Sequence, residues 1–116
     1  MLNVKRIYDA AEPQDGYRVL VDRIWPRGES KDKAKVDLSM KETAPSDALR
    51  KWFGHAPVRW MEFQARYRKE LQKHTGLLKQ MKQLEKKHGT VTLVFSARDE
   101  LHNQAVALRA YLIRRG

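Results

Sequence analysis

A run of apolar residues followed directly by a charged loop constrains the fold of this chain more than any other feature. Val19, Leu20 and Val21 are apolar in succession, which is typical of a strand buried on both faces, as parallel strands are. The loop that follows reads Asp22-Arg23-Ile24-Trp25-Pro26-Arg27-Gly28. Open α/β sheets bind their ligands beyond the carboxyl ends of their strands. The stretch therefore predicts a parallel sheet with a ligand site, suited to an anion, at this edge.

Strand and helix patterns alternate along the rest of the chain. Strand patterns cover residues 4–9, 18–23, 36–40 and 90–96, and the last has the strongest apolar run. Helix patterns run from Ser46 to Gly54, from Pro57 onward, between Gly76 and Gly89, and over residues 102–114. Residues 29–35 are expected to form a charged loop. We predict a single α/β domain over residues 1–116, with a small, mostly parallel three- to four-stranded sheet flanked by about four helices.

The connection between the first two predicted strands conflicts with an all-parallel sheet. Residues 10–16 contain the turn signals Pro13 and Asp15-Gly16. A parallel crossover ordinarily needs a dozen residues or more. Taken alone, this short connection predicts an antiparallel pair at that edge of the sheet.

Cysteine content and sequence motifs exclude several classes of protein. The chain has no cysteine, which excludes disulfides, thiolate catalysis and cysteine metal sites. The four histidines lack metal-ligand spacing, and no glycine-rich nucleotide loop is present. No stretch approaches the roughly 20 apolar residues of a membrane span, and residues 1–7 lack the features of a signal peptide. We therefore expect a cytoplasmic protein with no metal, no cofactor and no membrane partner.

The positive charge is concentrated in the second half of the chain. Residues 1–49 are neutral overall, and residues 50–116 carry the whole net charge of +10. Such an excess favours a polyanionic partner. Basic residues also alternate with aromatic ones over residues 50–68, a combination that can bind single-stranded nucleic acid. Because the aromatic spacing is helical, the alternative is a buried core stripe, with the lysines solvating the helix faces.

Two predicted strand ends bring the candidate site residues together. If the strands at residues 18–23 and 90–96 are parallel neighbours, the loops that follow them meet where the last helix begins. Guanidiniums there can hold phosphate or carboxylate through paired hydrogen bonds. The alternative is a structural network in which Asp22 and Asp99 pair with the arginines. We assign ligand binding to Arg23, Trp25, Arg27, Lys41, Arg98 and Asn103, and the candidates for catalysis are Asp22, Ser96 and His55.

Several of these residues have a structural alternative. Trp25 either stacks on a ligand or plugs the loop onto the core, and its bond to Pro26 can be cis. His55 lies in a short loop between two predicted helices. There it acts either as a general base or phosphate contact, or only as a cap of a helix end. Ser96 and His102 could form a nucleophile and its base, but Ser96 lacks the Gly-x-Ser-x-Gly motif in which such serines lie.

The motifs quoted above also resemble a known family. Residues 21–28 with Lys31, the Ala44-Pro45-Ser46 turn and the Leu49-Arg50-Lys51-Trp52-Phe53-Gly54-His55 segment are similar to the YeaO-like branch of domain-of-unknown-function family 488. The resemblance continues through Thr92-Leu93-Val94-Phe95-Ser96-Ala97 and Asn103-Gln104-Ala105 and covers nearly the whole chain. It implies a compact α/β domain with a small parallel sheet and no established activity.

Three differences from the family pattern matter. Longer relatives have a full helix between the first two strands, so the resemblance implies a shortened crossover here. The same longer relatives carry a cysteine-containing loop after the last strand, where this chain has Ser96-Ala97-Arg98-Asp99, so the resemblance implies no thiol chemistry here. Many have a tryptophan where this chain has Ser39, which argues against ligand stacking by that segment.

These inferences lead to one functional hypothesis and two alternatives. The first is a cytoplasmic protein with a site for a phosphate-like anion, acting on or binding a phosphorylated or nucleotide-like small molecule. In it the arginines hold the anion, Asp22 orients an arginine or acts as a base, and Asn103 positions the ligand. The second is a nucleic-acid-binding protein that uses the basic helices of residues 50–116. The third is a non-enzymatic interaction module.

Overall fold

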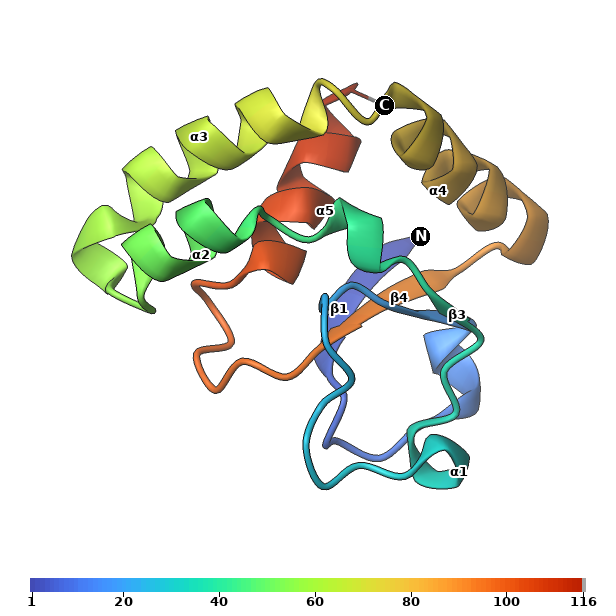
Figure 1. Cartoon of the computed structure of the whole chain (residues 1–116). Helices are drawn as coiled ribbons and strands as arrows, with labels where there is room; N and C mark the ends of the chain where they lie inside the picture. Colours follow the sequence, from blue (N-terminus) through green and yellow to red (C-terminus); the bar gives the residue numbers. More distant parts are fainter. Residues whose placement is uncertain (116) are drawn as a thin grey trace.

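A four-stranded, all-parallel sheet forms the centre of the computed structural model, which describes residues 1–115 and side chains up to residue 114 (Figure 1). The strands are β1 (Leu2–Arg6), β2 (Tyr17–Leu20), β3 (Leu38–Ser39) and β4 (Val91–Phe95). Their order across the sheet is β1-β4-β2-β3. The α/β class and the parallel sheet predicted from the sequence are confirmed.

The antiparallel pair expected at the first connection is wrong. β4 lies between β1 and β2 and pairs in parallel with both. The connection contains only a 3-10 helix, η1 (Pro13–Asp15). It suffices because a five-residue strand requires a return path of only about 15 Å, at roughly 3.3 Å per residue. Residues 7–16 can span that distance without a helix.

Five α-helices surround the sheet: α1 (Lys31–Ala34), α2 (Asp47–Phe53), α3 (Trp60–Leu71), α4 (Thr75–His88) and α5 (Gln104–Arg115). Two further 3-10 turns are η2 (Lys41–Thr43) and η3 (Pro57–Arg59). The caps predicted for α2 are confirmed, since the Ser46 side chain accepts the Leu49 N–H and Gly54 is left-handed. No helix among the described residues is long and apolar enough to cross a membrane.

Two helix boundaries differ from the sequence-based expectation. The segment expected as a charged loop contains α1, whose N-terminus is capped by Ser30 and which ends at the left-handed Lys35. Gly76 lies inside the first turn of α4 rather than before the helix. A four-residue helix is too short to show a period, and one exposed glycine in a first turn costs a helix only about 1 kcal/mol.

The two faces of the sheet are covered in different ways. Val19 and Leu93 point into a large core that α2, α3, α4 and α5 complete. Leu20 and Val94 point to the other face, where Ala34 of α1 and the connection after β1 cover a much smaller cluster. The prediction that β2 is buried on both faces is therefore confirmed.

Trp25 belongs to the smaller cluster. Its ring packs against the residues of that cluster, and its Nε1–H donates to the Glu29 carbonyl at 2.8 Å. No peptide bond among the described residues is cis. Of the two alternatives for Trp25, the structure confirms the plug that holds the loop onto the core.

The aromatic residues of α2 and α3 form the core stripe rather than a surface for bases. Phe53, Phe63 and Tyr67 are buried, with ring centroids 4.3 Å apart for the first pair and 5.6 Å for the second. Trp52 is half-buried beneath the guanidiniums of Arg59 and Arg66, which lie 5.4 and 4.2 Å from its ring centroid.

Candidate functional site

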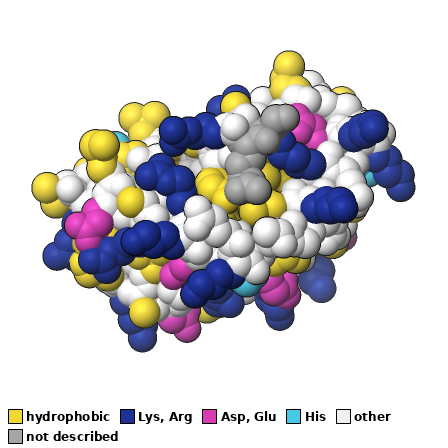
Figure 2. Space-filling model, turned by 90° about the horizontal axis from the view of Figure 1, so that it is seen from above, with side chains coloured by type: hydrophobic (Ala, Val, Ile, Leu, Met, Phe, Trp, Pro, Cys, Tyr) yellow, Lys and Arg dark blue, Asp and Glu magenta, His cyan; other side chains and the backbone are white. Residues whose placement is uncertain are grey.

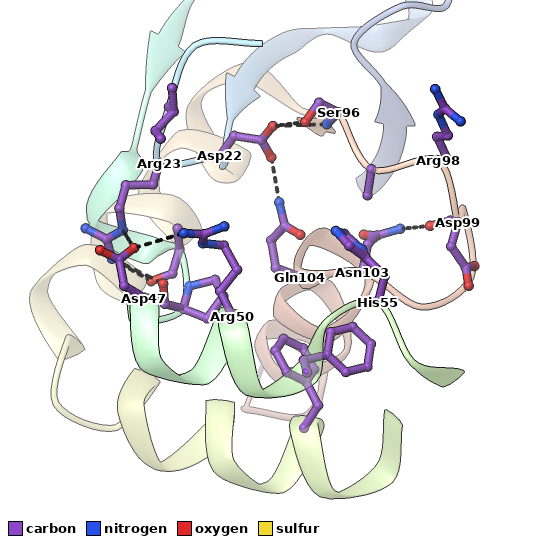
Figure 3. A pocket seen from close by; sticks show the side chains of 16 residues that line it. Asp22, Arg23, Asp47, Arg50, His55, Ser96, Arg98, Asp99, Asn103 and Gln104 are labelled. Atoms are coloured by element: carbon purple, nitrogen blue, oxygen red, sulfur yellow. Dashed lines mark hydrogen bonds and ion pairs between the residues drawn. The ribbon is translucent and has the colours of Figure 1, made fainter. Parts of the chain in front are cut away.

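A cavity of about 660 Å³ lies at the carboxyl edge of the sheet, between the ends of β2 and β4, α2 and the start of α5 (Figure 3). Six of the predicted site residues line it: Asp22, Arg23, His55, Ser96, Arg98 and Asn103. The apolar part of its lining includes Phe53 and Phe63 from the core stripe. The predicted meeting of the two strand ends is thus present in the structure.

Asp22 and Ser96 meet because their strands are neighbours in register. Leu20 lies opposite Val94, and each of the two site residues comes two positions after its member of this pair. Asp22 Oδ2 accepts the Ser96 N–H at 3.1 Å and the Ser96 hydroxyl at 2.5 Å, and Oδ1 accepts the Gln104 side-chain amide at 2.5 Å. Gln104, which sequence reasoning missed, comes from the first turn of α5.

Asp22 is a buried carboxylate with neutral partners. Its relative exposure is 8%, and no cation within residues 1–114 forms an ion pair with it. Burial raises the pKa of Asp22, and the hydrogen bonds from Ser96 and Gln104 offset this only in part. The expected structural network, with Asp22 and Asp99 paired to arginines, does not form among the described residues.

Arg23 is anchored at the other end of the cavity. Its Nη2 donates to the carbonyls of Ala44 and Pro45 at 3.2 and 3.3 Å. Its Nε lies 4.0 Å from an Asp47 oxygen that Arg50 approaches to 3.6 Å. Arg50 was not a predicted site residue. Its place three residues after Asp47 on α2 was readable from the sequence, but the face that α2 turns towards β2 was not.

Arg98 is the unattached guanidinium of the cavity. It is exposed and forms no hydrogen bond or ion pair with residues 1–114. His55, at the end of α2, is also exposed and is held in a left-handed conformation with φ of 57°. Its ring centroid lies 6.3 Å from that of Phe53.

Asn103 caps α5. Its Oδ1 accepts the Val106 N–H at 3.0 Å and its Nδ2 donates to the Asp99 carbonyl at 2.8 Å, so the side chain is already engaged on both sides. Asp99 accepts the Leu101 and His102 N–H groups and contacts His102 Nδ1 at 2.9 Å. The hydrogen bond from His102 is the main cause of a lowered pKa for Asp99.

Three predicted ligand residues lie outside the cavity lining: Trp25, Arg27 and Lys41. The loop after Asp22 turns so that Trp25 packs on the opposite face of the sheet, which carries Arg27 away. Arg27 is exposed, and its carbonyl accepts the Tyr8 hydroxyl at 2.9 Å. Lys41 is exposed on η2. Within the described chain, no group of three His, Asp or Glu side chains is placed to hold a metal ion.

Fold and site together define a small parallel α/β domain with a cavity at the carboxyl edge of its sheet. The chain belongs to the DUF488 family: the family model described as "Inactive DUF488-N3 subclade" matches residues 1–115. It is similar to the uncharacterised protein YeaO of Escherichia coli K12, with 40% identity over 96% of both chains.

Mycobacterial relatives match a shorter part of the chain. Uncharacterised proteins of Mycobacterium tuberculosis H37Rv and Mycobacterium bovis are each 47% identical over 66% of this chain, and the match covers 64% of their own length. No solved structure matches the chain.

Proposed function

We propose that this chain binds a phosphate-like, anionic small molecule in the cavity at the carboxyl edge of its sheet. The observation that carries the proposal is that three arginines line this cavity, Arg23 and Arg50 at one end and Arg98 at the other (Figure 3). Guanidiniums match phosphate and carboxylate through pairs of parallel hydrogen bonds. The volume of about 660 Å³ also lies within the roughly 300–1,000 Å³ of small-molecule sites.

The charges of the cavity favour an anion at either end. Arg23 and Arg50 share a single carboxylate, that of Asp47, at distances of 4.0 and 3.6 Å, which leaves an excess of positive charge. Arg98 has no acidic partner within residues 1–114. A bound anion would supply the missing counter-charge, and it would bind only to the folded chain, because residues far apart in the sequence form the cavity.

Several features favour binding without turnover. The Ser96 hydroxyl donates to Asp22, and the ring of His102 contacts Asp99, so neither belongs to a nucleophile-base pair with the other. The family model that matches the chain is described as inactive. We therefore propose a binding domain rather than an enzyme.

Phosphate titration of the melting temperature tests the proposal. We expect phosphate to raise the melting temperature in a saturable way, and by more than chloride does at equal ionic strength. The stabilisation of the folded chain by a bound ligand reaches about 2.7 kcal/mol at a phosphate concentration of 100 Kd. Arg98→Gln should reduce this phosphate-specific increase. Arg27→Gln makes the same change at an exposed position outside the cavity and should leave it intact. Equal effects of phosphate and chloride on the wild type would contradict the proposal.

Nucleic acid is a second candidate ligand, favoured by one surface. Figure 2 shows Lys and Arg side chains spread over the face seen from above, where α3 and α4 lie in Figure 1. On α4, Lys79 and Lys86 are exposed and Lys82 is half-buried, whereas Glu85 faces the N-terminal amino group at 3.0 Å. Reversing the charge of these three lysines separates the candidates: it should abolish salt-dependent nucleic-acid binding at about 0.1 M salt and leave the phosphate response unchanged.

A further inference from the structure

The wall of the cavity between β2 and β4 offers a ligand several hydrogen-bond acceptors. Asp22 takes three hydrogen bonds from the protein, whereas an ionised carboxylate has about four acceptor positions. Oδ2 accepts two of them and Oδ1 only one. One acceptor position of Oδ1 is therefore left for a ligand.

The two neighbours of Asp22 add further acceptors. The Ser96 hydroxyl and N–H both point to Oδ2, so Ser96 Oγ can offer a ligand only its lone pairs. Gln104 donates one of its two amide N–H groups to Oδ1, and its amide oxygen has no partner among residues 1–114. Figure 3 shows these three side chains together between the two arginine-bearing ends of the cavity. A wall with this pattern complements a group that carries several N–H donors.

The charge of this wall also favours a ligand group that carries N–H donors, because it favours a cation. Asp22 is 8% exposed and has no positive partner in the described part of the chain, whereas Arg98 nearby has no negative one. Burying an unpaired carboxylate is costly unless something compensates it. A ligand with one positive and one negative group would compensate both at once, with its carbon chain against Phe53 and Phe63.

We propose that the ligand is zwitterionic: a cationic nitrogen group binds at Asp22, Gln104 and Ser96, and the phosphate-like group binds at the guanidiniums. This inference rests on the proposed function and narrows it to aminoalkyl phosphates and compounds of the same charge pattern. The arginines select the anion, and Asp22 selects the ammonium, amidine or guanidinium at the other end.

Matched pairs of phosphate esters test the inference. In a series of aminoalkyl phosphates with two to four methylenes, each compound is compared with the alkyl phosphate in which a methyl group replaces the ammonium. Calorimetric titration of the wild type should show at least one aminoalkyl phosphate binding about tenfold more tightly than its partner. In Asp22→Asn the preference should disappear. Asp9→Asn makes the same change at an exposed position outside the cavity and should retain the preference.

Each outcome has one reading. Alkyl phosphates that bind as tightly as their amino counterparts across the series would overturn the zwitterion and leave the anion site standing. A preference that persists in Asp22→Asn would equally overturn the assignment to Asp22. Failure of every phosphate ester to bind would remove the proposed function, and this inference with it. Melting curves of both variants verify that each is folded.

Discussion

Two buried aspartates lie at opposite ends of β2, and their surroundings differ. Asp15 precedes the strand and is 6% exposed, and Asp22 follows it and is 8% exposed. Arg18 Nη1 lies 2.7 Å from Asp15 and Lys5 Nζ lies 3.2 Å from it. Asp22 has only the neutral donors of Ser96 and Gln104. The first carboxylate has its counter-charges within the chain, and the second does not.

The two pKa values move in opposite directions for this reason. Burial alone would raise the pKa of Asp15, but hydrogen bonds from the Glu12 N–H, Lys5 and Arg18 outweigh it and lower the pKa. At Asp22 burial prevails and the pKa is raised. Asp15 thus holds the connection between β1 and β2 against the sheet. Its backbone carbonyl also accepts a hydrogen bond from the Thr92 hydroxyl at 2.6 Å. At the cavity edge, Asp22 has hydrogen bonds but no counter-charge within residues 1–114.

The largest effect is expected for Asp15→Asn. The substitution leaves the buried guanidinium of Arg18 (3% exposed) without a carboxylate, and breaking such a pair costs about 3 kcal/mol of the free energy of unfolding. Denaturant unfolding at neutral pH measures it. Asp9→Asn makes the same change at an exposed position and should stay within about 0.5 kcal/mol of the wild type. Similar small losses in both variants would remove the distinction between a structural and a functional aspartate.

A smaller effect, with the opposite dependence on pH, is expected for Asp22→Asn. Because its folded pKa is raised, Asp22 contributes most to stability below its unfolded pKa and loses that contribution as pH rises through the folded pKa. The free energy of unfolding of the variant should therefore be less than about 1 kcal/mol below that of the wild type at pH 7. This difference should become smaller as the pH rises.

Asp15 provides the reference for that pH profile. Its pKa is lowered, so its contribution is full above the unfolded pKa and is lost as pH falls through the folded pKa. On acidification, the loss of unfolding free energy caused by Asp15→Asn should become smaller, whereas the loss caused by Asp22→Asn should become larger. Parallel pH profiles for the two variants would show that the two sites are electrostatically alike.

Local signals in the sequence predict most of the fold. The apolar runs of β2 and β4, and the Ser46 and Gly54 caps of α2, depend on neighbouring residues and were readable. The position of β4 between β1 and β2 was not, because strand order depends on packing between distant segments. The same division runs through the site. Asp22 and Ser96 follow from two parallel strand ends, but Arg50 and Gln104 require the orientation of α2 and α5.

A titration of individual carboxyl groups by NMR tests most directly the claim that Asp15 is held for the fold and Asp22 for a ligand. In the free protein, the pKa of Asp22 should lie above the usual value for aspartate, and that of Asp15 below it. Adding 2-aminoethyl phosphate, or the longer homologue that binds best, should lower the pKa of Asp22 and leave that of Asp15 unchanged. An Asp22 pKa below the usual value in the free protein, or one that a bound aminoalkyl phosphate does not lower, would contradict this account.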